Sequence, residues 1–127
     1  MVQPFYGTGM VHQSWRRGRG GKVPPCCTPG CQYDDQIVES LQLKRRGRSW
    51  SSVNDHSKWS VSQTALPGRD SVQVACFGDL NHMYSQSNRG GGALCFEGAV
   101  LWRILSGTVA SLEPCPQVAA GAVISRL

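Results

Sequence analysis

The stretch "VNDHSKWSVS", residues 53–62, brings together three side chains that can transfer protons or bind anions: Asp55, His56 and Lys58. On an extended strand, a histidine and a lysine two positions apart point to the same face. The imidazole can then attack a phosphorus or transfer a proton, while the ammonium holds a phosphate oxygen. Asp55 would point to the other face of a regular strand. At the start of a strand, however, it can turn to accept a hydrogen bond from the ring N–H.

A His-x-Lys triplet taken alone is weak support for function, because most short motifs of this kind are surface features without a chemical role. The elements that must position it are mainly strands. Apolar patterning predicts strands at residues 10–15, 36–43 and 72–81, and another through Trp59 and Val61. Residues 94–109 have a helical rhythm, with an apolar face of Ala99, Leu101, Trp102, Ile104 and Leu105. Strands mixed with one helix indicate an α/β or α+β unit.

Segments rich in glycine and arginine separate these elements. We expect "RRGRGGK", residues 16–22, and "KRRGRSWSS", residues 44–52, to be solvated basic loops. "SQSNRGGG", residues 85–92, is also a predicted loop, because three consecutive glycines permit backbone shapes that other residues avoid. Residues 116–127 form a small apolar tail that indicates little.

Length and charge limit the classes of function. A chain of 127 residues has room for one domain with one modest core. Its net charge of +5 comes mostly from ten arginines against three lysines, which favours a polyanionic partner. No apolar run reaches the length needed to cross a bilayer, so no membrane partner is predicted. The N-terminal residues, "MVQPFYGTGM", lack the basic head and apolar region of a signal peptide.

The six cysteines predict an oxidising compartment, because an even number in so small a chain is typical of disulfides. The alternative is a zinc site, since "CCTPGC" holds three thiols close together. No histidine or second cysteine pair stands near them at a finger-like spacing, so disulfides are favoured over metal. A disulfide-bonded chain without a signal peptide suggests a missing N-terminal part, or a gene model that starts late.

Five short strings taken together are more specific than the triplet. "DHSKW", "CFGDLN", "RGGGALC", "LW" and "PC" follow one another between residues 55 and 115. In this order they resemble the C-terminal end of the deoxyribonuclease II family, the acid nucleases of the phospholipase D superfamily. The resemblance extends more loosely upstream through "VHQSWRRGRGGKVPPCC" and leaves residues 116–127 as a tail. It covers nearly all of this chain but only about the last third of a family member.

The resemblance implies a phospholipase-D-like α/β sandwich of two similar halves, of which residues 1–127 are an incomplete, disulfide-stapled C-terminal lobe. In that family each half supplies one His-x-Lys motif to a single active site. One imidazole attacks the phosphodiester and forms a phosphohistidine, the other protonates the leaving 5′ oxygen, and water then releases a 3′-phosphate end. DNA is the implied partner. No metal or other cofactor is needed, and the lysosome or secretion is the implied location.

The same resemblance assigns residues. His56 and Lys58 match the second His-x-Lys motif, with His56 as nucleophile or general acid and Lys58 as a phosphate clamp. Asp55 becomes a candidate orienter of the ring. Asn81, which closes "GDLN", matches the polar residue that helps to bind the phosphate.

The cysteine pairing is also implied by the resemblance. Cys76 looks like the partner of Cys95. Cys115 looks like the partner of Cys27 rather than of Cys26. This leaves Cys26 and Cys31 to pair with each other or to stay free.

One departure from the family pattern leaves two hypotheses open. His12 and His82 have no lysine two positions on, so the sequence holds a single His-x-Lys motif. Under the first hypothesis the chain is the C-terminal lobe of a nuclease, either truncated by its gene model or completed by a second chain or by a homodimer. Under the second it is an inactive or DNA-binding basic fragment, with salt-dependent phosphate contacts from Arg16, Arg17, Arg19, Arg45, Arg46 and Arg48. His82 adjoins Asn81 and could reach the site, although an ordinary loop histidine is favoured.

Overall fold

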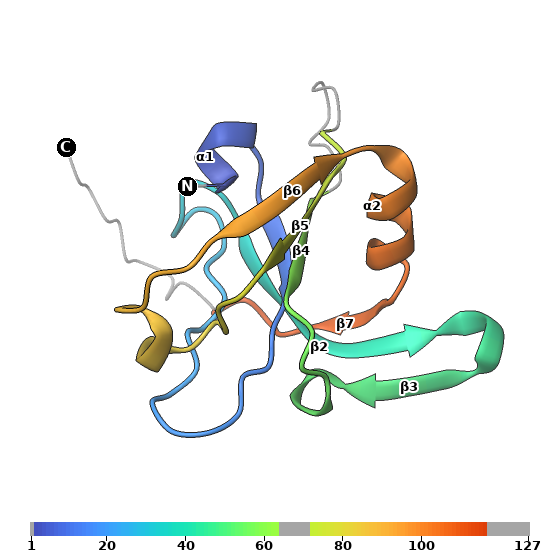
Figure 1. The fold of residues 1–127 in the computed structure, drawn as a ribbon, viewed down its shortest axis with the longest axis horizontal. Helices are drawn as coiled ribbons and strands as arrows, with labels where there is room; N and C mark the ends of the chain where they lie inside the picture. Colours follow the sequence, from blue (N-terminus) through green and yellow to red (C-terminus); the bar gives the residue numbers. More distant parts are fainter. Residues whose placement is uncertain (1, 64–71, 117–127) are drawn as a thin grey trace.

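The computed structural model describes residues 2–63 and 72–116 (Figure 1). The strands are β1 Met10–Gln13, β2 Asp35–Leu43, β3 Arg48–Ser51, β4 Trp59–Ser62, β5 Val74–Gly78, β6 Ala93–Glu97 and β7 Val109–Leu112. The α-helices are α1 Val2–Tyr6 and α2 Ala99–Ser106, and the 3-10 turns are η1 Lys44–Arg46, η2 Ser52–Asn54 and η3 Tyr84–Gln86. None of the helices in these two ranges is long and apolar enough to cross a bilayer.

The strands form one mixed sheet in the order β3-β2-β1-β4-β5-β6, with β7 also paired to β2. β1 and β2 run parallel, and every other pair along this path is antiparallel. The prediction of a mixed α/β unit is therefore confirmed, with strands predominating. The four predicted strands are present at β1, β2, β4 and β5.

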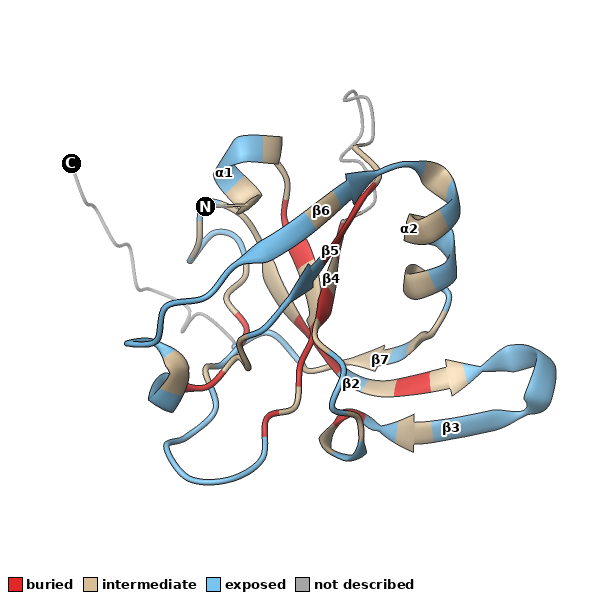
Figure 2. Cartoon of the chain, in the orientation of Figure 1, coloured by how far each residue is buried: buried red, intermediate tan, exposed pale blue. Residues whose placement is uncertain are grey.

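The two faces of the sheet differ in chemistry because side chains alternate along each strand. On one face the register aligns Val11, Val61 and Ala75 in a row. Helix α2 covers this row and buries an apolar cluster against it (Figures 1 and 2). The indole N–H of Trp102 donates to the carbonyl of Ser62 at 2.8 Å, which fixes the helix to β4.

The opposite face carries a polar row. The register aligns His12 with Ser60, Ser60 with Cys76, and Cys76 with Cys95. Helix α1 packs at the margin of this face, against a small cluster that includes Met10. The sheet therefore separates an apolar layer beneath α2 from a face that carries ionisable groups.

The predicted helix at residues 94–109 is partly wrong. Its first four residues belong to strand β6, which pairs with β5 along its whole length, and α2 begins only at Ala99. Gly98, at φ 148°, separates the two elements. Cross-strand pairing supplies long-range hydrogen bonds that helical periodicity alone does not reveal. Ile104, expected on the apolar face, is 59% exposed.

The two basic segments are not both simple loops. Residues 44–52 form a hairpin in which η1 and Gly47, at φ 58°, lead into β3. A positive φ is natural for glycine, so Gly47 permits the reversal. In the other segment Arg16 is only 3% exposed, contrary to the predicted solvated loop. Its guanidinium donates to Glu113 and to the carbonyl of Val23, each at 2.6 Å.

Three disulfides close the fold: Cys26–Cys31, Cys27–Cys115 and Cys76–Cys95. The last two are the pairs that the family resemblance implies, and the first is one of the two alternatives left open. Cys76–Cys95 joins directly opposed residues of β5 and β6. Cys27–Cys115 bridges a separation of 88 residues, and a loop of that size corresponds to about 4–5 kcal/mol in the chain-entropy account of disulfides.

Candidate active site

The segment that carries His56 lies between η2 and β4 and is held by residues at the end of β1. Gln13 donates from its side-chain amide to the carbonyl of Asp55 at 3.2 Å. The indole N–H of Trp15 donates to the carbonyl of Val53 at 3.0 Å. Strand β4 begins at Trp59, so residues 55–58 precede the strand that was expected to align them. Tertiary anchors, and not strand geometry, therefore position this motif.

Asp55 uses both carboxylate oxygens to shape its own loop. One oxygen accepts from the indole N–H of Trp50 at 2.9 Å, and the other accepts from the backbone N–H of Ser57 at 2.8 Å. Burial raises the pKa of Asp55, but these hydrogen bonds and the nearby His56 outweigh burial and hold it below its usual value. Among the described contacts, Asp55 makes no hydrogen bond to the His56 ring. Its carboxylate thus positions the backbone around the histidine.

The His56 imidazole is exposed and rests against one aromatic neighbour. Its ring centroid lies 4.3 Å from that of Trp15, with the planes tilted by 31°. The Lys58 ammonium donates to the carbonyl of His56 at 2.9 Å. This contact folds the lysine back toward the histidine, and its side chain also lines a neighbouring cleft. An imidazole in this setting is accessible to a substrate phosphate, with a cation close by.

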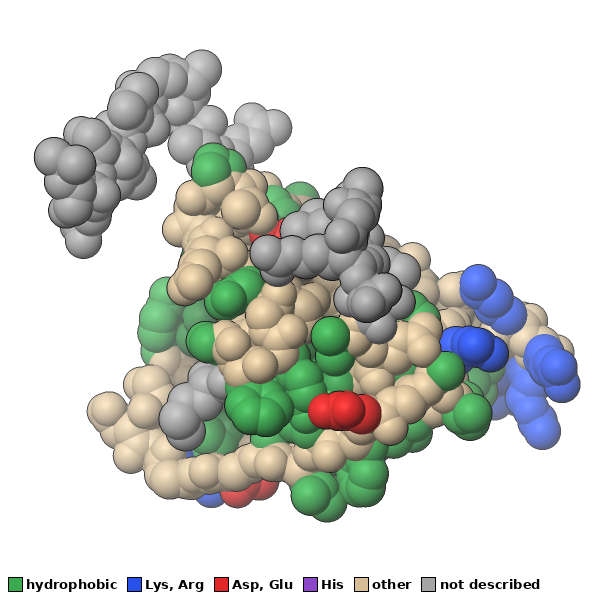
Figure 3. Space-filling model, turned by 90° about the horizontal axis from the view of Figure 1, so that it is seen from above, with side chains coloured by type: hydrophobic (Ala, Val, Ile, Leu, Met, Phe, Trp, Pro, Cys, Tyr) green, Lys and Arg blue, Asp and Glu red, His purple; other side chains and the backbone are tan. Residues whose placement is uncertain are grey.

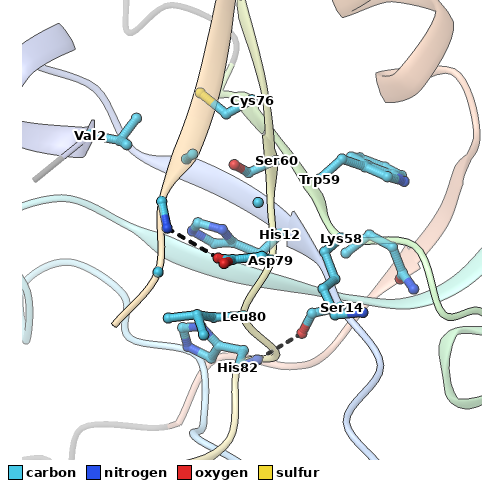
Figure 4. A pocket seen from close by; sticks show the side chains of 15 residues that line it. Val2, His12, Ser14, Lys58, Trp59, Ser60, Cys76, Asp79, Leu80 and His82 are labelled. Atoms are coloured by element: carbon cyan, nitrogen blue, oxygen red, sulfur yellow. Dashed lines mark hydrogen bonds between the residues drawn. The ribbon is translucent and has the colours of Figure 1, made fainter. Parts of the chain in front are cut away.

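The cleft beside Lys58 has a volume of about 290 Å³ and lies on the polar face of the sheet (Figure 4). His12, Ser60, Asp79 and His82 also line it. Asp79 accepts from the backbone N–H of Gly92 at 3.1 Å, which ties the triple-glycine loop to the end of β5. The cleft is thus built by segments that lie far apart in the sequence.

At one position of the cleft wall, any residue larger than glycine would force its neighbours to shift. A Cβ added at Gly91 would lie 2.7 Å from both Oδ1 of Asp79 and Cγ of Leu80, whereas one added at Gly90 would meet open space. Gly91, the second glycine of the "RGGG" string, therefore avoids a steric conflict that a side chain would cause. That residue allows the loop to close against the "GDL" turn.

Sequence patterns did not reveal that His12 and His82 share one carboxylate. Nε2 of His12 lies 2.6 Å from Oδ1 of Asp35, and Nε2 of His82 lies 3.2 Å from Oδ2. The two rings stack, with centroids 5.6 Å apart. These are close contacts between imidazole and carboxylate, and among the described residues Oδ1 of Asp35 and Nε2 of His82 are buried with no well-aligned hydrogen-bond partner. The three residues come from separate segments, so no local spacing could indicate the cluster.

Asn81, the expected phosphate ligand, lies apart from this cleft. It lines a neighbouring pocket with Gln86 and Val23, and its side-chain oxygen is buried without a hydrogen-bond partner. The predicted site residues therefore do not share one cavity. Lys58 faces the cleft, His56 lies exposed beside Trp15, and Asn81 follows the turn that closes the cleft.

Comparison with known proteins decides the family. The deoxyribonuclease II family model matches residues 1–115. The chain belongs to the deoxyribonuclease II family. It is 36% identical over 103 residues to cell-death-related nuclease 7 of Caenorhabditis elegans, covering 81% of this chain and 26% of that protein.

Two further relatives support the deoxyribonuclease II assignment. Plancitoxin-1 of Acanthaster planci is 30% identical over 110 residues, which is 87% of this chain and 28% of the toxin. Deoxyribonuclease-2-alpha of Bos taurus is 30% identical over 109 residues, which is 86% of this chain and 27% of the enzyme. The chain thus spans little more than a quarter of the length of these three relatives. No solved structure matches it significantly.

The described residues contain no group of three or more His, Cys, Asp or Glu side chains arranged to hold a metal ion. All six cysteines, including the three of "CCTPGC" considered as zinc ligands, are in disulfides.

Proposed function

We propose that this chain is the C-terminal lobe of an acid endonuclease that hydrolyses DNA phosphodiester bonds through a phosphohistidine intermediate. The family match over residues 1–115 supports a nuclease. The assignment to a site rests on His56, whose imidazole is exposed and whose backbone carbonyl accepts a hydrogen bond from the Lys58 ammonium. This pair supplies a group that can attack phosphorus and a cation that can neutralise the phosphate.

In the proposed reaction a nitrogen of His56 attacks phosphorus as the bond to the 5′ oxygen breaks. The leaving oxygen takes a proton from a second imidazole, and water then cleaves the phosphorus–nitrogen bond to leave a 3′-phosphate and free His56. Alternatively, His56 is the proton donor and the second imidazole attacks. The second imidazole would come from another His-x-Lys motif, on a second chain or in a second copy of this one. Lys58 would hold the phosphate, and no metal would take part. Asn81, the further phosphate ligand that the family resemblance implies, would have to turn out of the neighbouring pocket to join it.

The finer fold and the location are part of the same proposal. A mixed sheet with α2 on one face is compatible with one half of a phospholipase-D-like α/β sandwich. Three disulfides favour an oxidising compartment, in keeping with a lysosomal or secreted protein.

Plasmid nicking near pH 5 in EDTA tests the proposed reaction. The 127-residue chain is compared with His56→Ala and with Ser57→Ala, whose backbone N–H still bonds to Asp55. We expect nicking that persists in EDTA, disappears with His56→Ala and survives with Ser57→Ala. Nicking that needs a divalent metal, or that both variants retain, would contradict the mechanism.

A second candidate function rests on the hairpin formed by β2 and β3. Its exposed tip carries Lys44, Arg45, Arg46 and Arg48, and Figure 3 shows basic side chains gathered at that end of the molecule. These residues could bind DNA without cleaving it. If no variant nicks plasmid, this function predicts binding that weakens steeply with salt. Replacing Arg45 and Arg46 by Gln should then reduce the slope of log affinity against log salt.

A further inference from the structure

Trp15 occupies a position that the proposed cleavage chemistry leaves without a role. The centroid of its ring lies 4.3 Å from that of the His56 imidazole, with the two planes tilted by 31°. Its indole N–H donates to the backbone carbonyl of Val53 at 3.0 Å. One side chain therefore contacts the histidine ring directly and also bonds to the loop that carries this ring.

The course of the chain after β1 explains why Trp15 faces this loop. Successive side chains of an extended segment point to opposite sides, so residues two apart share a side. Gln13 ends β1 and donates to the carbonyl of Asp55 at 3.2 Å. Trp15, two residues on, donates to the carbonyl of Val53 in the same loop. Two side chains of one short segment thus hold the loop from the same side.

The two neighbours of Trp15 fix its backbone. Ser14 is buried, and its hydroxyl accepts from the backbone N–H of His82 at 3.0 Å. Arg16 is buried as well, and its guanidinium donates to Glu113 at 2.6 Å. Because both neighbours are anchored, the indole is a firm surface for an imidazole that is otherwise exposed.

A contact with the face of an imidazole leaves its nitrogens available. The lone pair of one ring nitrogen and the N–H of the other lie in the plane of the ring, so a partner on the face blocks neither. An exposed imidazole without such a partner turns about its side-chain bonds, and a reacting group that leaves its productive geometry loses rate. Trp15 therefore restricts the His56 ring without covering the atoms that react.

The indole face also suits the charge that the His56 ring carries. An imidazole becomes cationic when one nitrogen attacks phosphorus while the other keeps its proton, and a protonated imidazole is cationic as well. An aromatic face attracts a cation, and tryptophan does so most strongly. The Asp55 carboxylate beside the ring attracts the same cation, whereas the Lys58 ammonium at the His56 carbonyl repels it. These two charges oppose each other, and the indole adds a further attraction.

We propose that Trp15 is a positioning residue for His56, whose indole face fixes the imidazole and stabilises the ring when it is cationic. That this ring takes part in DNA cleavage rests on the proposed function. The contact itself needs no second imidazole, so it can be tested on this chain alone.

Two substitutions separate the ring of Trp15 from its hydrogen bond. Trp15→Phe and Trp15→Leu both lose the N–H that bonds to Val53, but only phenylalanine keeps an aromatic face. In proton NMR spectra we expect the ring protons of His56 to move downfield in Trp15→Leu, because the ring current of the indole is lost, and to move much less in Trp15→Phe. Trp50→Phe is the matched control. It removes an indole bond to Asp55 in the same loop and should leave these protons unshifted.

Phosphoramidate measures the chemical effect without DNA. It transfers its phosphoryl group to an imidazole, so that a nitrogen–phosphorus bond forms on histidine and ammonia leaves. Mass spectrometry then counts phosphohistidine at each position. We expect Trp15→Leu to slow phosphorylation of His56 about fivefold, the effect of losing one cation–π contact, and Trp15→Phe to recover part of that rate. His12 and His82 lie at Asp35, away from the substitution, and their rates should not change.

Plasmid nicking supplies a second readout. Trp15→Leu should lower kcat about tenfold and leave KM nearly unchanged, because the reacting ring loses its orientation while the phosphate contacts remain. Trp15→Phe should lower kcat less. If Trp15→Leu does not fold by circular dichroism, Trp15→Met takes its place, since it also lacks both the aromatic face and the N–H.

Equal rates for Trp15→Phe and Trp15→Leu would reduce Trp15 to an anchor of the loop and overturn the inference. Unchanged phosphorylation of His56 in Trp15→Leu would overturn it as well. Slower phosphorylation in a chain that never nicks plasmid would leave the positioning role standing while the proposed cleavage fails. Nicking at the full rate by Trp15→Leu would reject the role of Trp15 alone.

Discussion

The two histidine positions of this molecule have opposite environments. His56 is exposed, with its ring 4.3 Å from that of Trp15 and no carboxylate bonded to it among the described contacts. His12 and His82 are partly buried and each contacts a different carboxylate oxygen of Asp35, with the closer contact at 2.6 Å. An exposed imidazole is free to meet a substrate. The imidazoles beside Asp35 each have one nitrogen already turned to a carboxylate oxygen, so the two positions differ in how freely an imidazole can meet a ligand.

Lys58 is the residue that belongs to both positions, and its loss should have the largest effect. We expect Lys58→Ala to slow plasmid nicking by about 100-fold, the usual effect of removing one preorganised electrostatic group. It should also weaken oligonucleotide binding at pH 5.0. Lys58→Arg retains the charge and should recover the binding better than the nicking rate. If Lys58→Ala nicked plasmid at the wild-type rate, the lysine would have no part in the cleavage mechanism, and it would not connect the two histidine positions.

Gly91 tests whether the cleft can be disturbed without disturbing His56. An alanine there would press its Cβ on Asp79 and Leu80, which should shift the wall and destabilise the fold by about 1–3 kcal/mol. Urea unfolding measures the stability, and titration with a short thymidine oligonucleotide measures the binding. We expect affinity at pH 5.0 to fall more than the nicking rate does. Gly90→Ala is the matched control, because its added Cβ would meet open space. Equal effects of the two substitutions would contradict the steric account.

The smallest expected effect concerns acid stability. The pKa of Asp35 is lowered in the folded chain from an ordinary value of 3.8. Its ionisation therefore stabilises the fold above about pH 4, and this contribution is lost as the pH falls from there toward the folded pKa. Urea unfolding between pH 2.5 and 6 should show a weaker fall in stability for Asp35→Asn than for the wild type. Asp55→Asn is the comparison, because the pKa of Asp55 is also lowered but with less burial. If Asp55→Asn weakened the acid loss of stability more than Asp35→Asn did, the ionisation of Asp55 would contribute more to acid stability than that of Asp35, contrary to expectation.

Strands and chemistry-bearing motifs were partly predictable from local patterns. The alternation around Val61 and the apolar run through Val74 predicted β4 and β5, because a half-buried strand leaves a two-residue period. The beginning of α2 was misplaced, since the pairing of β6 with β5 overrides a helical rhythm that starts at Leu94. The burial of Arg16 was missed as well. Its partner Glu113 lies 97 residues away, and nothing local indicates such a pair.

The sequence by itself determined the His-x-Lys motif, the family and the cysteines available for cross-linking, because each depends on residue types at short spacings. Only the tertiary structure decided that His12, Asp35 and His82 meet, and that Lys58 joins their cleft while Asp55 turns to Trp50. The physical reason is that ion pairs and clefts depend on distances in space. Strand pairing brings together residues that the chain keeps far apart.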